Sequence, residues 1–281
     1  MKKYELTNET ITISNGKTLY RIRALIDIKA YGVKIGDLGG YIEKEENLSH
    51  DGDAWVSGNA RVSGNARIFD NALIVGDAWV VGNARVSGDA EVNGVTRVFD
   101  NALVYGNARV FDNAFVYDDA EVYGDAWVSG DAEIYGNARV YDNARVYDDA
   151  RVCGAAGIFD NAWVSGNARV SGNARVYDNV WVFGDSWVGG NARIGDNARI
   201  SGNANVCGDA WVYGHARVFD NAFVYGNAKV YGDALVSGDA EIYGNAEIYG
   251  NAEVSGDALV SGDSEVSDGV INQVPFEEER Q

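Results

Sequence analysis

The chain has 281 residues, a hydrophobic content of 46% and a formal net charge of −19. This sign of charge argues against direct binding to the phosphates of DNA or RNA. No stretch approaches the roughly 18 apolar residues of a membrane span, and the first ten residues lack the apolar run of a secretory signal, so we expect a cytoplasmic protein that does not enter a membrane.

Residues 1–52 do not repeat, and we expect them to form an N-terminal β-rich cap. The stretches 10–14 and 18–28 alternate in a way typical of strands and flank Asn15-Gly16. Asn-Gly readily adopts the left-handed backbone of a tight turn, so the segment predicts a β-hairpin. A bare terminal coil would expose a sheet edge, which is the reason to expect a cap at this end.

Residues 53–268 consist of 36 consecutive hexapeptides. Position one is Asn or Asp in 33 of them, position two is Ala in 32, and position four is Val or Ile in all 36. A fixed short period of this kind is typical of a solenoid, in which each repeat buries its apolar face against its neighbours. The sequence therefore predicts an all-β solenoid domain over residues 53–268.

Alternation along a strand assigns the two sides of each hexad. Positions two and four are small or β-branched and point inward, whereas positions three and five vary and point outward. We expect strands over positions two to five, joined by corners at positions six and one. All 24 Asp of the repeat lie at these corners, where Asp, Asn and Gly suit turn geometry. Corner calcium and an acidic surface that mimics nucleic acid are the alternatives for this charge.

The spacing aliphatic-x-x-x-small-x, as in Val128-Ser-Gly-Asp-Ala-Glu133, resembles that of the hexapeptide-repeat proteins. The resemblance covers residues 53–268. It implies a triangular, single-stranded, left-handed parallel β-helix of about 12 coils, with three hexads, or about 18 residues, in each coil. The segments 36–42 and 47–49 resemble the lead-in of poorly characterised bacterial and phage members with a short N-terminal cap.

Many proteins with this helix are acyltransferases, in which a histidine acts as general base and acetyl-coenzyme A is the donor. Of the two histidines, His50 precedes the first coil and His215 replaces Asn or Asp at a corner. Asp233 lies one coil beyond His215 and could orient its imidazole. No loop interrupts the hexads, so the acyltransferase with His215 as base is the alternative and not the leading hypothesis.

The outward positions point to a contact surface. Every third hexad should fall on one face, which defines a Trp55 set, an Arg61 set and an Arg67 set, each named for the residue at position three of its first hexad. Position five of the Arg67 set is aromatic in nine of twelve hexads. Arg139 and Arg175 lie beside this stripe, and Trp163 and Trp181 belong to the Trp55 set. The nine aromatic residues are Phe69, Tyr105, Tyr123, Tyr141, Phe159, Tyr177, Tyr213, Tyr231 and Tyr249.

Such a stripe could stack between coils, could join copies of the chain into a homo-oligomer, a trimer by the habit of the family, or could bind a protein or carbohydrate partner. The leading hypothesis is a non-catalytic β-solenoid scaffold or binding protein that associates with itself through these aromatic and Arg faces. The alternatives are the acyltransferase and an acidic decoy for a nucleic-acid-binding protein.

Little else in the sequence carries chemistry. Cys153 and Cys207 lie nine hexads apart, too far for a disulfide in this helix, and free thiols fit a reducing interior. Cysteine and histidine show no metal-ligand spacing, so we expect neither a metal nor a cofactor. Residues 269–281 break the period and are expected to form a C-terminal cap, with Val270-Ile271 and Val274–Phe276, followed by an acidic tail.

Overall fold

The structure, a computed structural model, describes residues 2–272. It divides into two compact units, Met1–Tyr147 and Asp148–Gln281. Apart from two short 3-10 helices, the regular structure of the described residues is β-strand. No helix among them is long and apolar enough to cross a membrane. The all-β prediction is confirmed.

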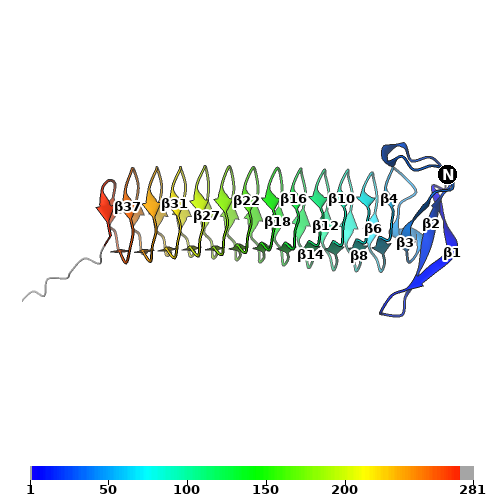
Figure 1. Cartoon of the computed structure of the whole chain (residues 1–281), viewed down its shortest axis with the longest axis horizontal. Coiled ribbons are helices and arrows are strands. Elements are labelled where there is room, and N and C mark those ends of the chain that lie inside the picture. Colours follow the sequence, from blue (N-terminus) through cyan, green and yellow to red (C-terminus); the bar gives the residue numbers. More distant parts are fainter. Residues whose placement is uncertain (1, 273–281) are drawn as a thin grey trace, which may run out of the picture. The chain divides into compact units, whose positions relative to one another are not determined.

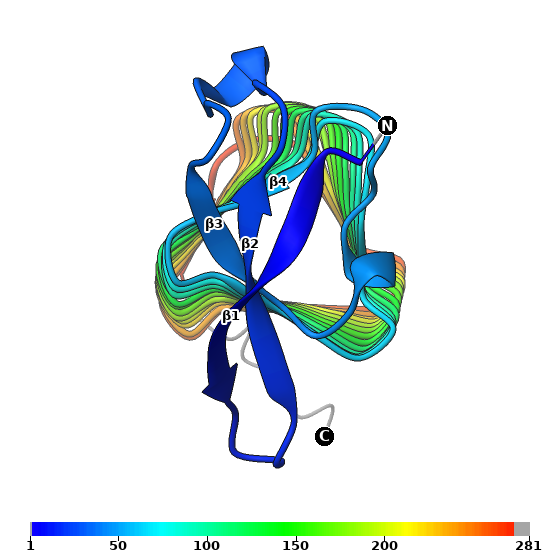
Figure 2. The same ribbon diagram turned by 90° about the vertical axis from the view of Figure 1, so that its right-hand side faces the viewer.

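The first unit begins with the cap. Strands β1 (Tyr4–Thr12) and β2 (Thr18–Ala24) form an antiparallel hairpin, and Gly16 at its turn has φ +82°. After η1 (Lys29–Tyr31), strand β3 (Leu38–Ile42) pairs antiparallel with β2 and parallel with β5, so it joins the hairpin to the first coil. Helix η2 (Glu45–Asn47) follows. β1 to β3 lie across the opening of the first coils (Figure 2).

The coils of the first unit are built from two-residue strands in three parallel sheets (Figure 1). The Trp55 set contributes β4 (Trp55–Val56), β7 (Leu73–Ile74), β10 (Glu91–Val92), β13 (Arg109–Val110), β16 (Trp127–Val128) and β19 (Arg145–Val146). The Arg61 set contributes β5 (Arg61–Val62), β8 (Trp79–Val80), β11 (Arg97–Val98), β14 (Phe115–Val116) and β17 (Glu133–Ile134). The Arg67 set contributes β6 (Arg67–Ile68), β9 (Arg85–Val86), β12 (Leu103–Val104), β15 (Glu121–Val122) and β18 (Arg139–Val140).

The second unit repeats this arrangement, and each strand again pairs with the strand three hexads later. The Trp55 set contributes β22 (Trp163–Val164), β25 (Trp181–Val182), β28 (Arg199–Ile200), β31 (Arg217–Val218), β34 (Leu235–Val236) and β37 (Glu253–Val254). The Arg61 set contributes β20 (Arg151–Val152), β23 (Arg169–Val170), β26 (Trp187–Val188), β29 (Asn205–Val206), β32 (Phe223–Val224), β35 (Glu241–Ile242) and β38 (Leu259–Val260). The Arg67 set contributes β21 (Gly157–Ile158), β24 (Arg175–Val176), β27 (Arg193–Ile194), β30 (Trp211–Val212), β33 (Lys229–Val230), β36 (Glu247–Ile248) and β39 (Glu265–Val266).

The inward and outward sides are as predicted, but the strands are shorter. Ala at position two and Val or Ile at position four have almost no exposed surface, as at Ala126 and Val128. Only positions three and four are strand, so the expectation of four-residue strands was wrong. The reason is that each side must bend into a corner at both ends. Inward hydroxyls are satisfied locally: Thr96 Oγ1 donates to the Asn93 carbonyl at 2.5 Å and Ser186 Oγ to that of Phe183 at 3.0 Å.

Position six carries the left-handed residue of each corner. Ten Asp residues there have φ between 56° and 63°, and glycines fill nearly all the remaining corners. A Cβ on Gly124 would lie 2.7 Å from the Asp142 nitrogen, so the next coil leaves little room for one. Asp offsets the strain by a hydrogen bond to the next coil: the Gly214 N–H donates to Asp196 Oδ2 at 2.9 Å. The negative charge of these corners therefore has a structural use.

Position one forms side-chain ladders between coils. The Asn65 amide donates to Asn83, Asn83 to Asn101, and Asn101 to Asp119, at 2.9 to 3.1 Å. The donor is always the earlier residue, and an Asp ends the run because a carboxylate cannot donate. Amide ladders of this kind are known to stabilise stacked parallel strands.

The last described residues depart from the period. Strand β40 (Val270–Ile271) pairs with β37, and Val254 has Ile271 as its partner, one residue short of the regular spacing. Val270 is 62% exposed. The expected C-terminal cap residues Val270 and Ile271 thus extend a sheet by one strand, whereas residues 274–276 and the acidic run 277–279 lie outside the described residues.

Candidate binding surfaces

His215 and Asp233 lie at successive corners of one column in the second unit. The imidazole is exposed, and the His215 backbone N–H donates to the Gly232 carbonyl at 2.7 Å. In the described part of the chain, no hydrogen bond or ion pair joins the imidazole to Asp233 or to Asn197, one coil earlier. The 18-residue period places His215 and Asp233 next to each other, but the hydrogen bond that would orient the imidazole as a general base is missing from this pair. The catalytic assignment stays a prediction.

The predicted aromatic stripe of the Arg67 set is a series of stacked rings. In the first unit Tyr105, Tyr123 and Tyr141 stack at 4.8 and 4.9 Å between centroids, with interplanar angles of 2° to 3°. In the second unit Tyr213, Tyr231 and Tyr249 stack at 4.9 and 5.1 Å, and so do Phe159 and Tyr177, at 5.3 Å. Phe69 instead lies under the Arg67 guanidinium. Centroid spacings are close to the strand spacing of about 4.8 Å, so the stacks first stabilise the coils.

Tyrosine hydroxyls in these and similar stacks reach carboxylates that lie 16 residues further along the chain. Wherever position five is Tyr and position three of the next coil is Glu, the hydroxyl donates to the carboxylate. Phe at position five never precedes such a Glu. The five pairs are Tyr105 with Glu121, Tyr117 with Glu133, Tyr225 with Glu241, Tyr231 with Glu247, and Tyr249 with Glu265, at 3.1 to 3.5 Å.

Electrostatics agree with this pairing. Burial, and then the adjacent carboxylate of Glu121, raise the pKa of Tyr105 to about 12. Burial and the hydrogen bond to Glu247 raise the pKa of Tyr231 to about 12 as well. Conversely, hydrogen bonds from Lys229 and Tyr231 lower the pKa of Glu247. The Tyr105 and Tyr231 hydroxyls therefore stay protonated donors at any physiological pH.

Arginine side chains lie over the aromatic rings at position three. The Arg109 and Arg145 guanidinium carbons lie 5.6 and 5.4 Å from the Trp127 ring centre. The predicted residue Trp181 stacks on Trp163 at 5.1 Å and is covered by Arg199 at 5.1 Å. Such cation–π contacts leave the indole edges, and not their faces, open to a partner.

The remaining predicted residues, Arg139 and Arg175, are both exposed on the Arg67 set. Arg139 Nη2 lies 3.7 Å from Glu121 Oε1. Sequence reasoning missed Phe183, which is 38% exposed, and it also missed three indoles. Trp at the outward position three was the available signal. These indoles belong to Trp127, Trp187 and Trp211, which are 39 to 41% exposed.

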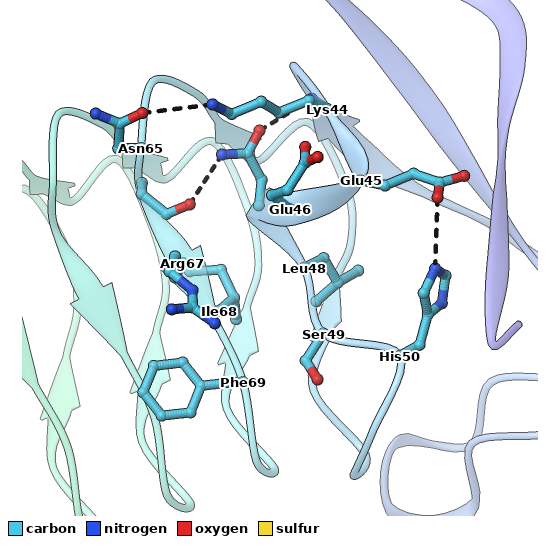
Figure 3. A pocket seen from close by; sticks show the side chains of 12 residues that line it. Lys44, Glu45, Glu46, Leu48, Ser49, His50, Asn65, Arg67, Ile68 and Phe69 are labelled. Atoms are coloured by element: carbon cyan, nitrogen blue, oxygen red, sulfur yellow. Dashed lines mark hydrogen bonds and ion pairs between the residues drawn. The ribbon is translucent and has the colours of Figure 1, made fainter.

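A pocket of about 430 Å³ lies where the cap meets the first coil, between η2 and β6 (Figure 3). The His50 ring stacks on Tyr4 at 4.4 Å, and its Nδ1 accepts the Lys3 backbone N–H at 3.2 Å. Nε2 has no hydrogen-bond partner among the described residues and lies 4.0 Å from Glu45 Oε2. Burial lowers the pKa of His50, which favours the neutral ring.

The same cap buries a lysine. Lys3 is 1% exposed, its Nζ donates to the Gly52 carbonyl at 3.1 Å, and burial lowers its pKa to about 8 against the opposing charges of Asp53 and Asp51. The Tyr4 hydroxyl is buried beside the Leu48 and Glu45 carbonyls, at 2.8 and 2.9 Å. These contacts anchor the chain start to the first coil, so the cluster has a structural explanation.

Residues 2–272 contain no group of three or more His, Cys, Asp or Glu side chains that could hold a metal ion. Cys153 and Cys207 are free and half-buried, and burial raises the pKa of the Cys207 thiol, which makes it a weaker nucleophile. Many of the corner carboxylates accept hydrogen bonds from the neighbouring coil, as Asp119 and Asp196 do.

One protein-family model matches parts of the repeat. The family model described as the YdcK beta solenoid repeat matches residues 132–146, 138–154, 162–176, 174–190, 192–208 and 222–238. The matches support a β-solenoid repeat protein, in agreement with sheets whose strands pair across one coil of three hexads. No curated protein matches the chain.

Proposed function

We propose that this β-solenoid is a non-catalytic scaffold that associates with itself through the Arg67 set, as a homo-oligomer with trimeric symmetry. The observation that carries the proposal is the stacked column Tyr105–Tyr123–Tyr141, with Arg139 exposed beside it. Tyr and Arg are enriched at protein interfaces, because they combine a large apolar area with polar groups at the edge.

The column is rigid before any partner arrives. Its rings are held by stacking and by the Tyr105 hydrogen bond to Glu121, so a partner loses little side-chain entropy on ordering them. A repeated flat surface also suits a second copy of the same chain, since identical spacings of about 4.8 Å match along both columns.

Two matched variants test this proposal. Tyr123→Asp alters the middle of the Arg67-set column, whereas Tyr117→Asp alters the middle of the equivalent stack Phe99–Tyr117–Tyr135 in the Arg61 set. Light scattering with size-exclusion chromatography should show an oligomer for the wild type and for Tyr117→Asp, and a monomer for Tyr123→Asp. A monomeric wild type at high concentration overturns the proposal.

The alternatives are weaker on the geometry. An acyltransferase would require His215 as base, and loss of acetyl transfer from acetyl-coenzyme A in His215→Ala would establish it against the scaffold. An acidic decoy would hold its partner by charge, and partners that stay bound at high salt count against it.

From the resemblance of the Val128–Glu133 type of spacing to the hexapeptide-repeat proteins we also infer a left-handed coil, and from the resemblance of the lead-in segments 36–42 and 47–49 a bacterial or phage origin. From the free thiols of Cys153 and Cys207 we infer a cytoplasmic location. Cell fractionation tests the cytoplasmic location.

A further inference from the structure

One indole of the second unit differs from the others in how it lies. Trp187 is 41% exposed, and its Nε1–H donates to Ser171 Oγ at 2.8 Å. A Cβ placed on Gly189 would lie 2.8 Å from the Trp187 ring. The indole therefore lies flat on the Gly189 backbone, in the orientation that the Ser171 hydrogen bond fixes.

Glycine at position five leaves room for the Trp187 ring in this orientation. Only two of the 36 hexads have Gly there, Gly189 and Gly195. Each lies beneath an aromatic ring. Gly189 lies beneath Trp187, and Gly195 lies beneath Tyr177, since a Cβ on Gly195 would come within 2.6 Å of the Tyr177 ring. Tyr177 is stacked on Phe159, whereas Trp187 has no ring or guanidinium over it within residues 2–272.

Among the described residues, the other exposed indoles each have at least one arginine over a face, whereas Trp187 has none. Trp127 is exposed to a similar extent, 39%, but Arg109 and Arg145 cover its two faces. Trp211 is covered by Arg193 at 4.9 Å. An exposed indole is thus not by itself a surface for stacking. The ring must also be held in place and must have a face that no side chain covers.

A polar groove of about 500 Å³ lies on the Asp185 side of strand β26, the strand that carries Trp187. It is lined by Asp149, Arg151, Asn167, Arg169 and Asp185. Arg169 is the register partner of Trp187 on the preceding coil, and Asp185 precedes Trp187 by two positions in the sequence. The Asn167 amide donates to Asp185 Oδ1 at 2.7 Å, which holds both side chains in place.

We propose that this Trp187 groove, made of Trp187 and the five groove residues, binds an uncharged oligosaccharide. The C–H groups on one face of a pyranose ring are weakly positive and pack against the negative face of an indole. Carboxylate, amide and guanidinium groups supply the acceptors and donors for hydroxyls. Two Asp and two Arg balance in charge, so the groove does not select a charged sugar.

Affinity gel electrophoresis in dextran, mixed-linkage β-glucan, galactomannan and glycogen tests the proposal, followed by saturation-transfer NMR with a tetrasaccharide of the polymer that retards the protein. The wild type should be retarded by at least one polymer. Trp187→Ala should weaken binding at least tenfold, and the matched control Trp127→Ala should leave it within twofold.

Gly189→Val provides a second variant that keeps the indole but removes its seat, and it should also lose binding while circular dichroism shows an intact fold. The proposal is overturned if none of the four polymers retards the wild type, if Trp187→Ala binds as the wild type does, or if Trp127→Ala loses as much affinity as Trp187→Ala.

Discussion

Within the first unit, the cap (residues 2–52) is held by contacts that occur once, whereas the coils (residues 53–147) are held by contacts that recur every 18 residues. Asn47 is completely buried, and its amide donates to the Ala66 and Gly64 carbonyls at 2.8 and 3.2 Å. Asn101 makes a similar bond to Asp119 on an exposed corner. An asparagine amide thus makes contacts in the cap that no other residue repeats, whereas in the coils it makes one of many equivalent hydrogen bonds.

The largest expected difference comes from removing these two amides. Asn47→Ala leaves buried carbonyls without donors and removes the acceptor of the Lys44 N–H, so it should lower the free energy of unfolding by about 2–4 kcal/mol. Asn101→Ala should lower it by less than about 1 kcal/mol, since water replaces the lost partner. Urea denaturation compares them, and equal losses would refute the contrast between cap and coil.

Lys3 gives the cap a pH dependence between pH 8 and about 10. Its pKa is lowered to about 8 in the folded cap, so between pH 8 and about 10 the unfolded chain holds more protons than the folded one, and stability rises with pH. Below pH 8 both states are protonated and the penalty is constant, at most about 3 kcal/mol.

Hydrogen exchange of residues 2–12 measured from pH 7.5 to 10, after correction for intrinsic rates, should show growing protection in the wild type. Lys3→Met should be protected equally across this range. Protection that falls toward pH 10 in the wild type would contradict a rise in stability with pH.

Corner strain should separate residue types within the coils. Gly124 has φ +70°, and Asp142 occupies the same corner one coil later with φ +56°. Gly124→Val should reduce the unfolding free energy by about 2 kcal/mol, because a β-branched residue is strained at positive φ. Gly124→Asn brings the same Cβ close to Asp142 but tolerates this backbone, so it should cost about 1 kcal/mol less than valine, and thermal melting distinguishes the two. If Gly124→Val leaves the unfolding free energy unchanged, the corner backbone relaxes to accommodate the side chain.

The smallest effect concerns the tyrosine–glutamate pairs. Tyr231→Phe removes the hydroxyl that donates to Glu247 at 3.1 Å, and should lower stability by about 0.5–1 kcal/mol. Tyr243→Phe is the matched control, since Tyr243 stacks on Tyr225 in the same way but has Leu259 in place of the glutamate on the next coil. A difference of zero in chemical denaturation would show that the pairing is incidental.

The period was enough to predict the sheets, the inward Ala and Val, and the Gly or Asp corners, because each follows from alternation and turn chemistry alone. It could not give the strand length, since the chain bends at each corner and only positions three and four keep strand geometry. The Lys3, Tyr4 and His50 cluster was also out of reach, because it joins positions far apart in a segment without a repeat. Trp127 and Trp187 both occupy an outward position three, and the consequence of Gly189 for the orientation of the Trp187 ring is seen only in the structure.

The amide ladder also limits how such a chain can change in length. Removal of three hexads, such as residues 107–124, would return every later Asn to the same column. Removal of a single hexad would leave the sequence of each remaining strand unchanged. It would, however, move every later hexad to a different sheet, so that the later Asn side chains would no longer stack on their present partners. Gain or loss of whole coils is therefore the natural step for a gene that encodes this protein, and a duplication of six codons is a disruptive one.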